Sequence, residues 1–507
     1  MVQENAKWHR NPNSQYEHFD RLPVLLKRFS FLEKMRIACI YSSKAIKYNP
    51  MTDRKVSKPF PWSIEVFVMM SVAAREYGSN TFGARNEQKF IQMCNAIWDA
   101  TSIIVERDCG DLSPLDVFLP TAGLTQFEFQ EMPIIKQYRY WKLFNKNAPA
   151  VSMVDEFQKK MGTSYDDFQI FSGVLSVMFF AQEVSRNITI PQSALQYLVY
   201  QRFPIAAEKL MITRDGYIAC LQAFLKGSPD PYKYVFLVSP SVQFPLISEE
   251  NKIYFPLPHL LTRSVTSSLF YRITEGNDIL RAKIGKHILE SYLFEIIRDS
   301  NVYDEVYQEK KYRYSGSEAS SPDVIARYAK SVLFLESKST VPSLGIRLLN
   351  FDSYKSNIEK ISDYMVQLYK QILRFESYNP FQGEISRDRN NYWGVVVVLE
   401  DAYIPRQLYY KKAQEILQLS SDSIEWTWFL THIKITSLYE IERLSFTKLN
   451  IIDACETIFS DDPYTYPFVG YPKYDAPLQN RELLSFKQDL QTKIRSILSE
   501  IHEAGLL

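Results

Sequence analysis

The chain is 507 residues long, with 46% hydrophobic and 14% aromatic residues and a formal net charge of +1. A chain of this length exceeds the usual limit for one hydrophobic core, so we expect two or three domains. The apolar content excludes a disordered protein. The nearly neutral charge excludes a general electrostatic attraction to nucleic acid, so binding of that kind would depend on local groups.

The sequence indicates a cytoplasmic protein. Its first residues lack the apolar core of a signal peptide, and no apolar run approaches the roughly 20 residues that cross a bilayer. Its five cysteines are scattered, without the C-x-x-C spacing of a zinc site. This usage is typical of a reducing compartment rather than of a disulfide framework. We therefore expect neither disulfides nor a membrane segment.

Residues 1–230 are predicted to form a mainly helical N-terminal domain. The expected helices cover residues 64–77, 86–105, 166–184, 191–200 and 217–226. Pro191 falls where a helix would begin, a position that tolerates proline. Such a domain could serve substrate recognition, homo-oligomerisation or regulation by a protein partner.

From residue 232 onward the sequence predicts short strands instead of helices. Residues 234–238 form a short apolar run, and residues 244–247 with 253–255 predict a β-hairpin. We place a domain boundary near Pro229-Asp230 and assign residues 231–280 to a β-hairpin bridge or extension.

Residues 281–507 are predicted to form an α/β domain with a C-terminal helix. The expected order is an amphipathic helix over 285–297, strands over 302–314, 324–326 and 332–335, a long helix over 353–375, strands over 391–399 and 432–436, and a last helix over 482–504. The strand over 391–399 is apolar on both faces, which indicates a sheet covered by helices. The fold class is therefore a mixed sheet flanked by helices, preceded by the helical domain.

Two acids and a lysine fall at the ends of neighbouring predicted strands. Pro322-Asp323 opens one strand, and Glu336-Ser337-Lys338 ends the apolar run that follows. If the strands pair, both carboxylates emerge at one end of the sheet, and Lys338 shares a face with Glu336 because strand side chains repeat every two residues.

Three other segments have the same acid-x-Lys spacing. They begin at Asp53, Glu250 and Glu309. Asp53 lies in a polar, basic stretch, Glu250 in a polar turn, and Glu309 in a highly charged strand that we expect to be exposed. Only Glu336 combines an uninterrupted apolar strand with a preceding Pro-Asp strand.

This arrangement resembles the PD-(D/E)xK, or restriction-endonuclease-like, nuclease superfamily. The resemblance covers roughly residues 281–442, in the order helix, three strands, helix, strand. It implies that a helical glutamate precedes the first core strand. Glu290 is the best match for that residue and Glu295 is the alternative.

The resemblance implies metal-assisted hydrolysis of a phosphodiester. Asp323 and Glu336 would hold Mg²⁺, for which Mn²⁺ is expected to substitute, with the backbone carbonyl of Ser337 as a further ligand. Glu290 would bind a second metal or a metal-bound water. Lys338 would orient or deprotonate the attacking water, and because two carboxylates should raise its pKa, orientation is the favoured role. The alternative for the trio is a surface acid and a Glu/Lys pair at a strand end.

The sequence supports weaker interpretations of several further residues. Gln367 and Gln371 lie on the helix after the proposed catalytic strands and could contact substrate backbone. Glu400-Asp401 could bind metal, but strand ends often finish in solvated acids. His287 is more plausible as a helix-surface histidine than as a general base. The sequence contains no P-loop and no nucleophile elbow, which argues against NTP hydrolysis and serine hydrolase chemistry.

The sequence therefore predicts a Mg²⁺-dependent nuclease whose substrate is nucleic acid, with DNA favoured over RNA because most of the superfamily cuts DNA. Large additions to this nuclease core resemble prokaryotic restriction or anti-phage defence effectors. Two alternatives stay open, a non-catalytic nucleic-acid-binding scaffold and a regulatory subunit that retains the nuclease fold. Metal binding that depends on Asp323 would separate the enzyme from both.

Overall fold

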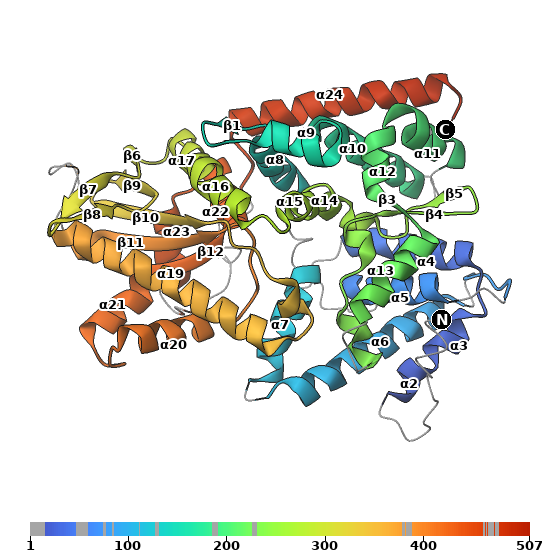
Figure 1. Ribbon diagram of the computed structural model, residues 1–507, viewed down its shortest axis with the longest axis horizontal. Coiled ribbons are helices and arrows are strands. Elements are labelled where there is room, and N and C mark those ends of the chain that lie inside the picture. Colours follow the sequence, from blue (N-terminus) through green and yellow to red (C-terminus); the bar gives the residue numbers. More distant parts are fainter. Residues whose placement is uncertain are drawn as a thin grey trace.

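The protein is described by a computed structural model (Figure 1). The structure describes residues 16–46, 59–74, 78–83, 86–110, 112–126, 131–184, 191–225, 231–377, 381, 388–459, 462, 464, 471 and 476–506. The predicted boundary at Pro229-Asp230 and the acid-x-Lys segment at Asp53 lie outside these ranges. The described fold is mixed α/β, with a helical N-terminal half and a five-stranded mixed sheet in the C-terminal half.

The N-terminal half is built from helices, as predicted. They are α2 (Glu17–Asp20), α3 (Leu22–Leu26), α4 (Phe31–Ile46), α5 (Pro61–Ala73), α6 (Glu87–Asp108), α7 (Pro114–Gln126), α8 (Pro133–Phe144), α9 (Met153–Met161), α10 (Tyr165–Val184), α11 (Gln192–Tyr197), α12 (Pro204–Leu210) and α13 (Arg214–Leu225). All five expected helices are present with shifted ends. The ends follow local chemistry. For example, the Ser152 side chain accepts a hydrogen bond from the Asp155 amide at the start of α9, and Gly162 ends that helix in the left-handed region.

Two small sheets that precede the five-stranded sheet in the chain lie outside it. β1 (Asn147–Ala148) pairs with β2 (Val151–Ser152), and β3 (Met211–Thr213) pairs in parallel with β4 (Leu246–Glu249). β4 and β5 (Lys252–Tyr254) form the predicted hairpin. The apolar run at 234–238, in contrast, begins within a 3₁₀ helix, Pro231–Phe236.

The five-stranded sheet has the order β12-β11-β10-β9-β6. Its strands are β6 (Glu305–Gln308), β9 (Val324–Tyr328), β10 (Ser331–Lys338), β11 (Tyr392–Val398) and β12 (Ile433–Ser437). β6, β9 and β10 are successively antiparallel, whereas β10, β11 and β12 are parallel. Every residue of β11 is buried, as its apolar run predicts.

The predicted strand over 302–314 is wrong in one respect. The chain leaves the sheet after β6 and forms a separate hairpin of β7 (Lys311–Tyr314) and β8 (Ser317–Ser320). Ser315 and Gly316 both have positive φ angles, as a two-residue turn of this type requires.

Helices cover both faces of the sheet. Period-two alternation sends Leu333 and Leu335 toward the core that contains α17 (Glu290–Asp299), and Val332 and Phe334 toward α19 (Phe351–Ser377). The remaining helices of this half are α14 (Leu261–Ser264), α15 (Ser267–Thr274), α16 (Asp278–Ile284), α18 (Leu344–Arg347), α20 (Arg406–Leu417), α21 (Ile424–His432), α22 (Leu438–Phe446), α23 (Ile451–Phe459) and α24 (Arg481–Glu503). α23 falls in a stretch for which the sequence predicted no element.

The C-terminal helix α24 returns to the N-terminal half. It packs on α8 and α10, and Figure 1 shows it in red along one side of the molecule. One continuous hydrophobic cluster joins α8, α10 and α24 to the α17 face of the sheet. The helical half and the sheet therefore share a core.

Gly394 in β11 lies against side chains of α19. A Cβ atom at this position would come within 2.8 Å of Ile372 and Ile433 and 3.2 Å of Leu368. We expect Gly394→Ala to lower the free energy of unfolding by about 1–3 kcal/mol, since overpacking forces neighbours from their rotamers. Gly83→Ala is the matched control, because a Cβ atom there would meet no other atom within 4 Å. Urea denaturation of both variants would test this, and equal stabilities would contradict it.

Candidate active site

Three acids from adjacent strands align at one end of the sheet. The β9–β10 register pairs Val324 with Leu335, so one further step brings Asp323 opposite Glu336. The Glu309 amide donates a hydrogen bond to the Asp323 carbonyl oxygen at 2.9 Å, which extends the β6–β9 pairing by one residue. Glu309, Asp323 and Glu336 therefore lie side by side on three neighbouring strands, at one end of the sheet.

Asp323 is held by its neighbour strand. Its Oδ2 atom accepts hydrogen bonds from the Ser337 amide at 2.7 Å and the Ser337 hydroxyl at 3.0 Å. These contacts fix the direction of the carboxylate. Ser337 thus positions Asp323, and the metal-ligand role of its carbonyl stays a prediction.

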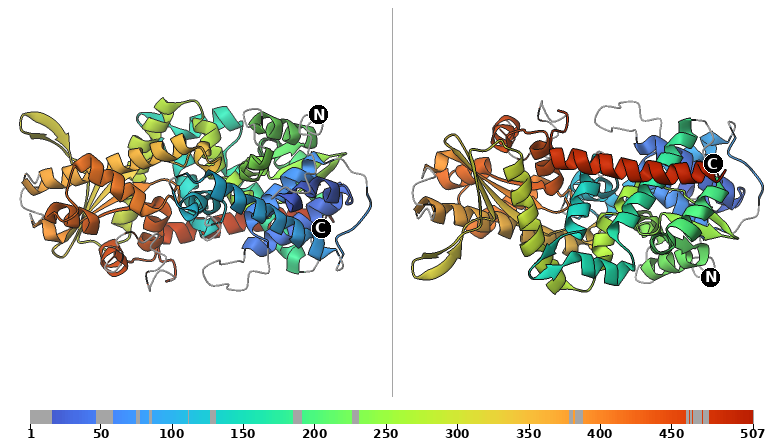
Figure 2. Two further views of the ribbon diagram at one scale, coloured as in Figure 1. Left: turned by 90° about the horizontal axis from the view of Figure 1, so that it is seen from below. Right: turned by 90° about the horizontal axis from the view of Figure 1, so that it is seen from above.

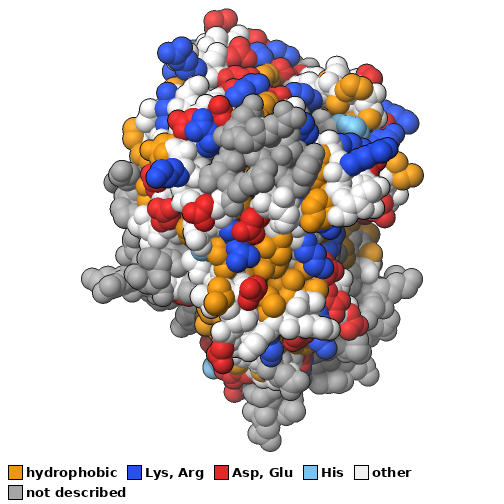
Figure 3. Space-filling model, turned by 90° about the vertical axis from the view of Figure 1, so that its left-hand side faces the viewer, with side chains coloured by type: hydrophobic (Ala, Val, Ile, Leu, Met, Phe, Trp, Pro, Cys, Tyr) orange, Lys and Arg blue, Asp and Glu red, His pale blue; other side chains and the backbone are white. Residues whose placement is uncertain are grey.

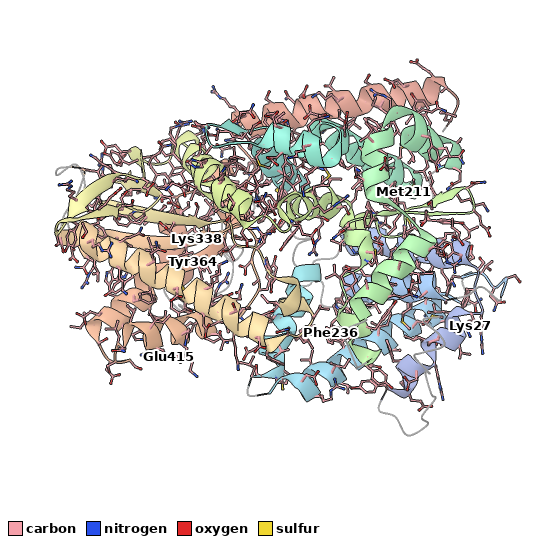
Figure 4. All side chains as sticks on the ribbon, in the orientation of Figure 1. Lys27, Met211, Phe236, Lys338, Tyr364 and Glu415 are labelled. Carbon is pink, nitrogen blue, oxygen red and sulfur yellow. The ribbon has the colours of Figure 1, made fainter. Side chains whose placement is uncertain are left out.

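Glu336 and Lys338 share a face of β10, as the strand periodicity predicted. The Lys338 Nζ atom lies 2.6 Å from Glu336 Oε1 and 4.9 Å from the centroid of the Tyr364 ring on α19. Figure 4 labels Lys338 and Tyr364, which reach the site from the sheet and from the helix. Glu336 Oε2 is buried without a hydrogen-bond partner in the described part of the chain. The strand continues through this pair rather than ending at the apolar run.

Lys338 is a cation at neutral pH. Burial lowers its pKa, but the charges of Glu336 and Asp323 and the hydrogen bond to Glu336 outweigh that effect and raise the pKa above its ordinary value. This agrees with the expected orienting role, because a protonated lysine cannot accept a proton from water.

Glu290 faces this cluster from the first turn of α17. Burial raises its pKa to about 8, with further contributions from the charges of Asp323, Glu309 and Glu336. Glu295, the alternative, points elsewhere. It accepts hydrogen bonds from Lys146 at 2.6 Å and Ser291 at 3.2 Å.

The carboxylates repel one another in a partly desolvated site. Burial and the charge of Glu336 raise the pKa of Asp323 to about 7, although Ser337 and Lys338 oppose the shift. Oxygen donors with an unsatisfied buried atom suit Mg²⁺. Within the described ranges, however, no three Asp, Glu, His or Cys side chains are arranged to hold one metal ion together. The oxygen donors suit the ion chemically, and in the structure one of them, Glu336 Oε1, is paired with Lys338.

The raised pKa values predict a pH-dependent stability of the metal-free protein. A raised carboxyl pKa means that the folded state binds the proton more tightly than the unfolded chain, whose carboxyls titrate near about 4. That stability is present at low pH and is lost as the pH rises toward the folded pKa values of about 8 for Glu290 and about 7 for Asp323. We expect Glu290→Gln to flatten the fall in melting temperature between about pH 5 and 8. If melting temperature falls equally with pH in the wild type and in Glu290→Gln, this prediction is contradicted.

The remaining predicted residues lie apart from the acids. Gln367 and Gln371 line a groove on α19, where Gln371 is 8% exposed and its Oε1 atom has no hydrogen-bond partner within the described chain. His287 is partly buried in the π-helical turn before α17. The prediction of solvated acids at Glu400-Asp401 is wrong. Asp401 is buried and pairs with Arg406 at 2.5 Å, and Glu400 accepts a hydrogen bond from Tyr140 at 2.8 Å.

Sequence reasoning missed three contributors. The charged sequence around Glu309 predicts an exposed residue, but Glu309 is partly buried beside Asp323. The sequence feature that could have identified Glu309 is its position at the end of a strand, two residues before the hairpin. Tyr364 beneath Lys338 could have been found from the helical repeat with Gln367 and Gln371. Nothing in the sequence near Glu400 indicates its ion pairs with Lys136 and Arg139 of α8.

Comparisons with family models, with curated proteins and with solved structures found no match to this chain. Among the residues that the structure describes, no helix is both long enough and apolar enough to cross a bilayer. All five cysteines are free thiols.

Proposed function

We propose that this protein is a metal-dependent nuclease that hydrolyses phosphodiester bonds, with DNA as the first substrate to test. The observation that carries the proposal is the meeting of Asp323 and Glu336 at adjacent strand ends, with Lys338 paired to Glu336 and Glu290 facing them. The order α17, β6, β9, β10, α19, β11 supports the proposal that this segment is a restriction-endonuclease-like core.

Asp323, Glu336 and Glu290 would hold Mg²⁺ or Mn²⁺, which would polarise the phosphate and lower the pKa of a bound water. Ser337 keeps the Asp323 carboxylate directed at the site through its two hydrogen bonds. Lys338 remains protonated and stands where it can orient a water or offset charge on the scissile phosphate. Tyr364 limits the directions in which the lysine can point.

A second function is supported by one specific observation. Lys338 already neutralises Glu336 at 2.6 Å, so the chain could keep the fold and bind nucleic acid without cutting it. The nucleic-acid binding of such a scaffold or regulatory subunit would not depend on divalent metal.

The test is incubation of the purified full chain with supercoiled plasmid, linear duplex, single-stranded DNA and RNA, with Mg²⁺, Mn²⁺ or EDTA. Cutting that requires metal and disappears in Asp323→Asn supports the nuclease and identifies its polymer. Binding without cutting in every condition supports the scaffold.

A further inference from the structure

The β7–β8 hairpin is an arm that leaves the sheet beside the acid cluster. Its base is tied by two hydrogen bonds, from the Lys310 amide to Ser321 Oγ and from the Ser321 amide to the Lys310 carbonyl oxygen. Asp323 follows its second strand by three residues. In both views of Figure 2 this yellow hairpin extends beyond the rest of the sheet. A two-stranded hairpin is only marginally stable when it is isolated.

The hairpin and α19 enclose a groove of about 460 Å³. Glu318, Ala319 and Ser320 line one wall. Asp363, Gln367, Lys370, Gln371 and Arg374 line the other. The residues that line the groove do not include the acid cluster itself. The link between the two is Asp363, which is next in sequence to Tyr364, whose ring contacts Lys338.

The groove carries cations that make no ion pair within the described chain. Lys370 and Arg374 are exposed on successive turns of α19, and the described part of the chain provides no ion pair for either. Arg313 on β7 does not itself line the groove, but it pairs with the lining residue Glu318 in the hairpin register, and it is likewise exposed and without an ion pair among the described residues. The acid Glu318 pairs with Lys311 at 2.9 Å, and the other acid of the groove is Asp363.

Charge at this end of the molecule is local rather than general. Figure 3 shows Lys and Arg side chains interspersed with Asp and Glu, without a broad area of one sign. Unpaired cations in a narrow groove, flanked by amide side chains, suit the regularly spaced charges of a sugar-phosphate backbone. The same groups offer little to an acidic protein, whose charges have no such regular spacing.

We propose that the β7–β8 hairpin and α19 form two walls of a groove that binds the backbone of the strand to be cut. Lys370 and Arg374 contact phosphates from one wall and Arg313 contacts them from the other. The proposal rests on the proposed nuclease function and adds the track by which the substrate reaches the acids.

The test uses Asp323→Asn full chain without divalent metal, so that binding is measured without cleavage. Fluorescence anisotropy would follow a labelled oligonucleotide, duplex or single-stranded, over a range of salt concentrations. Removing both cations with Lys370→Ala and Arg374→Ala should weaken binding to every sequence and lower the slope of log affinity against log salt by about 2. Arg313→Ala should lower it by about 1 more.

The matched control is Lys159→Ala with Lys160→Ala, two exposed lysines on α9 in the helical half. It makes the same change in net charge and should leave the slope unchanged. Three results would overturn the groove proposal. They are an unchanged salt slope in the groove variant, an equal loss of slope in the control variant, and no binding of the oligonucleotide by Asp323→Asn. Metal-dependent cutting by the wild type would still stand in each of those cases, so failure of the groove is distinguishable from failure of the nuclease.

Discussion

Asp323→Asn is expected to abolish metal-dependent cutting while leaving the protein folded. The amide oxygen of asparagine can still accept the hydrogen bonds from Ser337, so the strand end keeps its structure. The negative charge that would hold a cation is lost. We expect the single-turnover rate to fall at least about 100-fold, the lower range for removal of one preorganised electrostatic group.

The control for this prediction is Glu250→Gln, which removes a carboxylate from another acid-x-Lys segment. Glu250 lies exposed in the turn between β4 and β5, away from the sheet that carries Asp323. The single-turnover cutting rate of Glu250→Gln should equal that of the wild type. Loss of cutting in both variants would mean that net charge or folding matters rather than the site, and cutting that survives in Asp323→Asn would place the active site elsewhere.

Arg139→Met is expected to cause a large loss of stability. Arg139 is 0% exposed and donates to both oxygens of Glu442, at 2.8 and 2.6 Å, while Tyr292 donates to Glu442 at 2.7 Å. Burial raises the pKa of Glu442, and Arg139 opposes that shift. Without the arginine a buried carboxylate loses its cation, which costs about 3–5 kcal/mol. Urea denaturation would measure it.

A double variant separates the lost ion pair from lost packing. Arg139→Met with Glu442→Leu removes both charges, so it should recover part of the stability that either single change loses. Arg298→Ala is the surface control, because its pair with Asp299 is about half exposed and should contribute at most about 1 kcal/mol. A double variant no more stable than the singles would contradict the account.

The same ion pair shows how the helical half reaches the candidate site. Glu442 on α22 links α8 to Tyr292, two residues after Glu290 on α17. Arg139 Nη1 also lies 3.5 Å from Glu400, which follows β11. α8 is therefore bonded to elements on two sides of the acid cluster.

The sheet was predictable where burial is continuous. The runs that form β10 and β11 are apolar on both faces, and the amphipathic pattern of α19 extends over its length. The departure of β7 from the sheet was not predictable, because its alternation resembles that of β6. The contacts that set the hairpin apart are two hydrogen bonds between Lys310 and Ser321, one through the backbone and one through the Ser321 hydroxyl.

The candidate site was predictable in part for a similar reason. Asp323, Glu336 and Lys338 are close in sequence, and period-two geometry brings them together once two strands pair. Glu309 depends on a third strand whose polar sequence gives no sign of burial. Arg139 and Glu442 are 303 residues apart, and nothing local in either segment identifies the other as its partner.

Metal binding tests the central claim most directly. Isothermal titration of Mn²⁺ or Mg²⁺ into the full chain at about pH 8 should show binding with release of protons, because Asp323 with a pKa of about 7 is mostly ionised there while Glu290 with a pKa of about 8 is still about half protonated. Asp323→Asn should bind at least about tenfold more weakly, and Glu250→Gln should match the wild type. Absence of binding by the wild type, or equal binding by Asp323→Asn, would contradict the proposal that these acids form a metal-dependent active site.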